Sequence, residues 1–182
     1  MSEIPCCVLG ATGFIGGQIA RVARSKGLKV RAVRRRSGAV GAIGDLDVDW
    51  VSGDLNDIAS LVTAMRGCPL VFHAAAYYPQ RARDPWEAVR HDVAGMRNVL
   101  TAAATAGVKR LIYTSAPTTI GPPSDTTRQA NETDLYLPGS FPTPYFEVKW
   151  AKEMEAIRAA AQGQPVITVI PPVALTRTVA DS

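Results

Sequence analysis

The segment from Cys6 to Gly17 constrains the fold more than any other part of the chain. An apolar run ends in glycines at positions 10, 13 and 16, and a helical pattern of apolar residues begins at Phe14. In such a segment the first glycine lets the chain turn off a strand, the second lets the backbone approach a pyrophosphate, and the third lets the helix pack on the sheet. The first-turn N–H groups and the helix dipole favour a phosphate at the same place. The segment therefore predicts dinucleotide binding; a tight strand–helix turn without a ligand is the alternative.

The end of the expected second strand indicates which dinucleotide. This strand covers 28–33 and runs into Arg34, Arg35 and Arg36, with no acidic residue beside them. About 20 residues beyond the glycines, an acidic residue would bind the ribose 2′-hydroxyl of NAD, whereas an arginine accommodates the 2′-phosphate of NADP. NADP (NADPH) is therefore expected over NAD. The alternative is a solvated basic loop, because long basic side chains need no partner.

Strands and helices alternate along the whole chain. Glycines 27, 67 and 107 end helices, and Asp84, Pro85 and Glu87 provide the N-cap, first-turn proline and capping-box acid of another. After a first strand through Cys6 and Cys7, the pattern predicts strands at 28–33, 48–51, 70–73, 110–114 and 166–170, and helices at 14–26, 57–65, 85–106 and 144–161. This alternation indicates an α/β doubly wound parallel sheet, a Rossmann fold. Right-handed crossovers leave the strand order 3-2-1-4-5-6, with helices on both faces of a single domain over 1–182.

Composition excludes several other classes. The 182 residues are 47% hydrophobic and 20% charged, which is ordinary for a soluble globular protein. No apolar run reaches the roughly 18 residues of a membrane span, and the N-terminus lacks the basic and apolar segments of an export signal. Three cysteines, two of them adjacent, are expected to be reduced and buried in a cytoplasmic protein, with no metal. The net charge of +4 comes partly from the three arginines, so no nucleic-acid partner is expected.

Tyr145 and Lys149 lie four residues apart in one expected helix, so their side chains share a face. A free tyrosine has a pKa near 10, too high for easy proton exchange at neutral pH. A lysine charge about 6 Å away, at an effective dielectric near 20, would favour the tyrosinate by about 3 kcal/mol, or roughly two pKa units. Tyr145 is therefore a candidate general acid/base. Taken alone, the spacing is more often a solvated helix face.

Together with the glycine turn, this pair resembles the extended short-chain dehydrogenase/reductase family. Within that family, the chain is similar to the dihydroflavonol-reductase-like and NAD-dependent epimerase/dehydratase groups. Each matching piece is loose, but all occur in the family's order: Gly10-Ala-Thr-Gly-Phe-Ile-Gly16, Gly53-Asp54-Leu55, His73-Ala-Ala-Ala76, Asp92-Val-Ala-Gly-Met-Arg-Asn-Val-Leu100, Leu111-Ile-Tyr-Thr-Ser115 and Pro144-Tyr145-Phe-Glu-Val-Lys149.

The resemblance implies a role for each matched position. Tyr145 would be the acid/base, and Lys149 would bind the nicotinamide ribose and lower the tyrosine's pKa. The other positions would hold the cofactor: Gly10, Thr12, Gly13, Phe14, Ile15 and Gly16 the pyrophosphate, Arg34 and Arg35 the 2′-phosphate, Asp54 and Leu55 the adenine, Ala74, Ala75 and Ala76 the riboses, and Pro171 the nicotinamide.

The chain departs from the family's pattern in three places. Ala116 stands where a Ser or Thr usually hydrogen-bonds the substrate oxygen, so Ser115 becomes the candidate catalytic hydroxyl, with Thr118 as a further donor. Asp92 and Met96 replace a frequent Asn and Thr. The family also usually continues for another hundred or more residues, which form most of the substrate pocket.

These observations lead to two classes of function. The first is an NADP-dependent oxidoreductase that transfers hydride between the nicotinamide and a small-molecule carbonyl or secondary alcohol. The second is a dinucleotide-binding module with little or no turnover; a sugar-nucleotide epimerase or dehydratase is a further alternative. Because of Ala116, good cofactor binding and slow turnover are expected. The resemblance also implies a homodimer through the helices that start near Asp84 and Pro144.

Three smaller expectations concern single positions. His73 is predicted to be a packed, hydrogen-bonded histidine rather than a catalyst. Asp54 could simply cap the next helix. Tyr77 and Tyr78, with the proline-rich loop at 116–142, suit an apolar or aromatic substrate, although stacking at the edge of the core would explain them as well.

Overall fold

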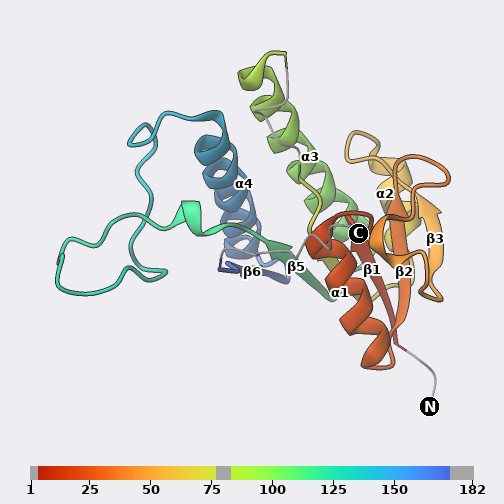
Figure 1. The fold of residues 1–182 in the computed structure, drawn as a ribbon. Coiled ribbons are helices and arrows are strands. Elements are labelled where there is room, and N and C mark those ends of the chain that lie inside the picture. The colour runs from red at the N-terminus through yellow and green to blue at the C-terminus, as the bar shows by residue number, and fades with distance from the viewer. Residues whose placement is uncertain (1–3, 77–82, 173–182) are drawn as a thin grey trace, which may run out of the picture.

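A computed structural model describes residues 4–76 and 83–172, and in these ranges the strands form one parallel sheet (Figure 1). The sheet order is β3-β2-β1-β4-β5-β6, which confirms the prediction. Leu9 pairs with Val33 on one side and with His73 on the other, so the carboxyl ends of three strands meet at one edge. The strands are β1 (Pro5–Leu9), β2 (Lys29–Arg34), β3 (Asp49–Ser52), β4 (Leu70–His73), β5 (Arg110–Thr114) and β6 (Val166–Val169).

Helices cover both faces of the sheet, as predicted. On one face α1 (Phe14–Ser25) and the short 3₁₀ helix η1 (Gly41–Ile43) enclose a core that includes Cys6, Val8 and Val30. The other face packs against α2 (Ile58–Met65), α3 (Pro85–Thr105) and α4 (Pro144–Ala161), with α3 and α4 side by side (Figure 1). Alternate residues of β1 pack into the two cores, because successive side chains of a strand point to opposite faces of the sheet.

Local signals explain where the helices begin and end. The turn after α1 contains Gly27 at φ +77°, a conformation that favours glycine. Asp84 accepts hydrogen bonds from the backbone N–H groups of Trp86 and Glu87, which confirms it as the N-cap of α3. The cap of α2 is Asp57, whose carboxylate accepts from the Ser60 N–H. Asp54 is therefore not the helix cap.

Two connections contain short elements of their own. η1 lies between β2 and β3, and its Ile43 is buried in the core beneath α1. The loop between β5 and α4 contains the 3₁₀ helix η3 (Pro117–Thr119) and an antiparallel bridge between Ile120 and Leu135. Figure 1 shows this loop, green to cyan, reaching out beside α4.

The cysteines, the length of the helices and two tyrosines were also subjects of prediction. Cys6, Cys7 and Cys68 are free and buried, as expected, and burial raises the pKa of the Cys6 thiol to about 11. Among the described helices, none is both long and apolar enough to cross a membrane. Tyr77 and Tyr78 lie outside the described residues, so their proposed part in substrate binding stays a prediction.

Candidate cofactor and active site

The carboxyl ends of the strands border a cavity of about 1010 Å³. It lies at the boundary between β1 and β4, where the order of the strands in the sheet reverses. Open parallel sheets bind ligands at this point. Its volume is at the upper end of the range for ligand pockets, about 300–1,000 Å³. Every residue predicted for the site lines it, although each individual role stays a prediction: Gly10, Thr12, Gly13, Phe14, Ile15, Gly16, Arg34, Arg35, Asp54, Leu55, Ala74, Ala75, Ala76, Ser115, Tyr145, Lys149 and Pro171.

The glycine turn forms the floor of this cavity. Gly10 adopts φ +87°, and a Cβ there would lie 2.7 Å from the backbone nitrogen of Ala75. The Gly13 N–H donates to the Gly10 carbonyl at 2.9 Å, which closes the turn. A Cβ on Gly16 would lie 2.1 Å from the same carbonyl oxygen. The absence of side chains therefore lets β1, β4 and α1 approach one another at the backbone level.

The N-terminus of α1 fits a phosphate. Its N-cap is Gly13, which has no side chain to cap the first-turn N–H groups, and within the described residues its first turn holds no acidic side chain. By contrast, Asp57, Asp84 and Thr143 cap α2, α3 and α4. Donors left open at a helix N-terminus, together with the helix dipole, favour an anion. The residues present thus match the pyrophosphate of a dinucleotide.

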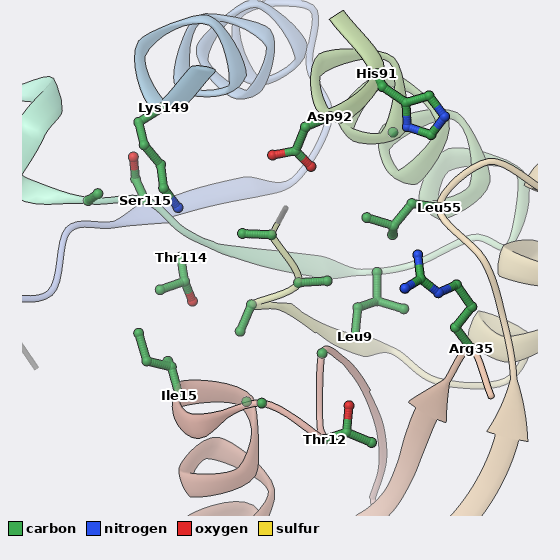
Figure 2. Close-up of a pocket in the computed structure, with 18 of the residues that line it drawn as sticks. Leu9, Thr12, Ile15, Arg35, Leu55, His91, Asp92, Thr114, Ser115 and Lys149 are labelled. Atoms are coloured by element: carbon green, nitrogen blue, oxygen red, sulfur yellow. The ribbon is translucent and has the colours of Figure 1, made fainter. Parts of the chain in front are cut away.

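Arg34 and Arg35 both line the cavity at the carboxyl end of β2. The Arg34 guanidinium lies over the Trp50 ring, 4.9 Å from its centroid, which holds it at the rim. Figure 2 shows the Arg35 side chain directed toward Leu55. The Leu55 loop is in turn fixed to α3, because the Asn98 amide donates to the Leu55 carbonyl at 2.8 Å. Two cations therefore stand beside the predicted adenine side of the cavity.

Tyr145 and Lys149 lie on the first turns of α4 and face the same cavity, as their spacing predicts. The Lys149 ammonium is 5.8 Å from the centroid of the Tyr145 ring, and Figure 2 shows the lysine reaching into the cavity. Burial and the neighbouring charge of Lys152 lower the pKa of Lys149 to about 8, while Asp92 opposes this change. Both side chains therefore lie at the same wall of the cavity.

The hydroxyl groups near this pair are arranged differently from the expectation. Ala116 is buried at the cavity wall and provides no hydroxyl. Ser115 donates its hydroxyl to the Glu153 carboxylate. A serine hydroxyl has one proton to donate, so in this structure Ser115 has none for a ligand oxygen. Thr118 also lines the cavity, and its buried hydroxyl has no hydrogen-bond partner among the described residues.

One face of α3 borders the site, and sequence reasoning missed most of it. Glu87, His91, Asp92 and Gly95 all line the cavity. Glu87, His91 and Gly95 follow one another at intervals of four, and Asp92 precedes Gly95 by three, which places them on one helix face. This signal could have been read from the sequence. Figure 2 shows the side chains of His91 and Asp92 on the helix above the cavity. The sequence singled out Asp92 as the first residue of a matched segment, in place of a frequent asparagine, and not as part of the site.

His73 is packed as predicted but lacks the expected hydrogen bonds. It is fully buried, and neither ring nitrogen has a hydrogen-bond partner within the described ranges. Its ring lies 5.6 Å from that of Tyr113, between centroids. Burial, with the charges of Lys152 and Lys149, lowers the pKa of His73 well below its usual value, so the ring is neutral. Among the described residues, no group of three or more His, Cys, Asp or Glu side chains could hold a metal ion.

Replacing Lys149 by methionine is expected to stabilise the protein at pH 7. Since the pKa of Lys149 falls from 10.5 to about 8, its charged form costs free energy in the folded state. Below pH 8 the lysine is charged in both the folded and the unfolded chain, so the full cost applies. Between pH 8 and 10.5 only the folded lysine has lost its proton, and the cost fades. The gain from the substitution should reach about 3 kcal/mol at most.

Urea unfolding of wild type and Lys149→Met at pH 7 and pH 9.5 measures this gain. The variant leaves no unpaired buried charge, because the Asp92 carboxylate keeps Lys152 as its partner at 3.0 Å. We expect a smaller difference in unfolding free energy at pH 9.5. Equal differences at the two pH values would show that the charge of Lys149 does not destabilise the folded state.

Comparison with known proteins extends these observations. The model of the NAD-dependent epimerase/dehydratase family matches residues 6–176. Among curated proteins, the chain is similar to "Putative dihydroflavonol 4-reductase" of Synechocystis sp. The two are 38% identical over 164 residues, which make up 90% of this chain and 47% of the relative.

Solved structures also match nearly all of this chain and about half of their own length. The crystal structure of gox2253 shares 31% identity and a TM-score of 0.77, and the match covers 93% of this chain and 51% of that one. MoeE5, solved in complex with UDP-glucuronic acid and NAD, shares 29% identity and a TM-score of 0.70, over 93% of this chain and 53% of that one. The chain thus spans about half the length of the relatives it matches.

Proposed function

The chain belongs to the NAD-dependent epimerase/dehydratase family, and from this premise we propose that it is the cofactor-binding domain of an NADP-dependent oxidoreductase. Residues 1–182 would form this single domain, and the reaction would be hydride transfer to or from a small-molecule carbonyl or secondary alcohol. One observation carries the proposal. The glycine turn, the arginines after β2 and the Tyr145–Lys149 pair line one cavity, although they come from separate parts of the chain.

The position of each residue in the cavity suggests its role in binding or in proton transfer. When bound, NADPH supplies the hydride, or NADP accepts it. The open N-terminus of α1 would hold the pyrophosphate, and Arg34 and Arg35 the 2′-phosphate. As hydride reaches the carbonyl carbon, Tyr145 would donate its phenolic proton to the carbonyl oxygen; in the oxidation it would take that proton back. Lys149 would bind the nicotinamide ribose and stabilise the tyrosinate.

A titration with both cofactors tests the proposed preference. We expect NADPH to bind more tightly than NADH, because Arg34 and Arg35 line the cavity where an acid would select NAD. Replacing both arginines by serine should shrink the difference by about 1.5–3 kcal/mol, the scale of hydrogen bonds to charged groups. Quenching of protein fluorescence gives the affinities.

Arg36→Ser is the matched control for that titration. Arg36 is exposed and follows the two arginines directly, but it is not among the cavity's lining residues. Its replacement should leave the preference for NADPH unchanged. Equal affinities of the wild type for the two cofactors, or tighter binding of NADH, would contradict the proposal.

A second candidate function is a dinucleotide-binding module with little or no turnover. It is favoured by the hydroxyls around the site, since Ala116 has none and Ser115 gives its proton to Glu153. Losing one donor to a developing oxyanion costs about 10²–10³ in rate in other enzymes. Reductase assays with a panel of aldehydes and ketones distinguish the two candidates. A sugar-nucleotide substrate, as held by MoeE5, is the third class for that panel.

The family premise also suggests an assembly and a location. We propose a homodimer through α3 and α4, and the exposed side chains of Trp86 on α3 and Ile157 on α4 support it. Residence in the cytoplasm and the absence of nucleic-acid partners stay predictions from composition.

A further inference from the structure

A second lysine lies behind the first on α4. Lys152 follows Lys149 by three residues, and its side chain is only 1% exposed. Its ammonium lies 3.0 and 3.1 Å from the two carboxylate oxygens of Asp92, whose side chain is 2% exposed. The Ala75 carbonyl at the cavity wall is 3.5 Å away. A fully buried ion pair thus joins α3 to α4 directly beside the candidate active site.

Stability alone does not account for this pair. Burying two charges requires removing both from water, and an apolar pair of similar volume is often as stable or more stable. α3 and α4 also share another ion pair near the surface, between Arg97 and Glu155 at 2.7 Å. The helices therefore have an ionic connection that needs no buried lysine. The position of the buried pair points to a role in the site.

Asp92 faces the same cavity as Lys149. Both residues line it, and Figure 2 shows their side chains projecting from neighbouring helices toward the same space. A lone buried carboxylate at position 92 would attract the Lys149 ammonium away from Tyr145. Lys152 occupies both carboxylate oxygens and neutralises that attraction. In the same way, the Asp92 carboxylate neutralises the Lys152 ammonium, which would otherwise repel the Lys149 ammonium.

We propose that Asp92 and Lys152 are a positioning pair for Lys149: each cancels the other's charge, so that the Lys149 ammonium stays directed at Tyr145 and the cofactor. The consequence for turnover rests on the proposed function, whereas the coupling of the three charges does not. The two charges act on Lys149 in opposite directions, since Lys152 lowers its pKa and Asp92 raises it.

Three other ionisable groups around Lys149 are hydrogen-bonded or uncharged. The Glu153 carboxylate accepts the Ser115 hydroxyl, and His73 is neutral. Burial raises the pKa of Tyr113 above its usual value, so it carries no charge at neutral pH. The groups that face this region from the packed elements are Tyr145 and Glu153 on α4, Glu87, His91 and Asp92 on α3, His73 on β4, and Tyr113 at the end of β5.

Titration of Lys149 by NMR in the cofactor-free chain tests the coupling. The Lys149 side-chain signal is assigned by its loss in Lys149→Arg. In Lys152→Met the lone Asp92 carboxylate should raise the pKa of Lys149, and in Asp92→Asn the lone Lys152 ammonium should lower it, each by about one pH unit or more. The double variant should return the pKa close to that of the wild type.

Glu155→Gln is the matched control. It also removes a carboxylate from an ion pair between α3 and α4, but one whose cation, Arg97, has a side chain that is 59% exposed. It should leave the pKa of Lys149 unchanged. If Lys152→Met does not fold, the double variant has no lone buried charge and still provides the comparison with Asp92→Asn. Single variants that shift the pKa in the same direction, or not at all, overturn the proposal.

Turnover provides an independent readout. If the chain reduces a carbonyl substrate, the pH midpoint of kcat should move in opposite directions in the two single variants and return in the double variant. A merely structural pair would lower stability without opposite shifts. Opposite NMR shifts in a chain that binds neither NADPH nor NADH would support the positioning pair and reject the proposed oxidoreductase function.

Discussion

Gly16→Ala is expected to destabilise the protein by about 3 kcal/mol and to abolish cofactor binding. The added Cβ would lie 2.1 Å from the Gly10 carbonyl oxygen and 2.5 Å from its carbon. Both are backbone atoms of a turn that is already closed by the Gly13 N–H. No side chain can move aside, so α1 must shift away from β1. Overpacking that shifts the backbone typically costs about 1–3 kcal/mol, and the upper end applies here because only backbone atoms can move.

Gly17→Ala provides the control at the next residue of the same helix. A Cβ there would lie 3.4 Å from the Ala11 carbonyl oxygen and from a methyl group of Ile43, so only small adjustments are needed. Alanine also has the higher helix propensity, by about 1 kcal/mol. Urea unfolding should therefore show a large loss at position 16 and little or none at position 17. Similar losses at both positions would mean that the close approach to Gly10 is not essential.

Tyr145→Phe is expected to lower any reductase turnover by about 10²–10⁴, the usual contribution of a positioned acid/base. Phenylalanine keeps the ring, which lies 5.8 Å from the Lys149 ammonium, and removes only the hydroxyl. Affinity for NADPH should hardly change, because the predicted cofactor contacts lie on other residues. The measurement compares kcat and cofactor affinity in the two proteins.

Tyr136→Phe is the matched control for the loss of a tyrosine hydroxyl. The Tyr136 hydroxyl donates to Glu147 at 2.8 Å, on the same helix as Tyr145, but Tyr136 does not line the cavity. This variant should lose some stability and keep its turnover. Unaltered turnover in Tyr145→Phe would remove Tyr145 from the mechanism and leave its spacing from Lys149 as an ordinary helix face.

The strand order and most element boundaries could be predicted because their signals are local. Asp84, Pro85 and Gly27 act on backbone groups within a few residues, and alternating strands and helices leave few right-handed topologies. The part of the cavity lining that follows the strands was also predictable, since the carboxyl ends of parallel strands meet at one edge of the sheet. The cap of α2 was harder to predict, because Asp54 and Asp57 are both suitable residues near the same helix start.

The sequence by itself determined the glycine turn, the two arginines beside it and the four-residue spacing of Tyr145 and Lys149, because each depends on neighbours along the chain. Tertiary structure decided where the polar groups found partners. Ser115 donates to Glu153, and Lys152 pairs with Asp92 across 60 residues. His73 is buried beside Tyr113 without the hydrogen bonds expected of it. A buried polar group takes the partner that packing brings near it, and that proximity is not encoded in any local pattern.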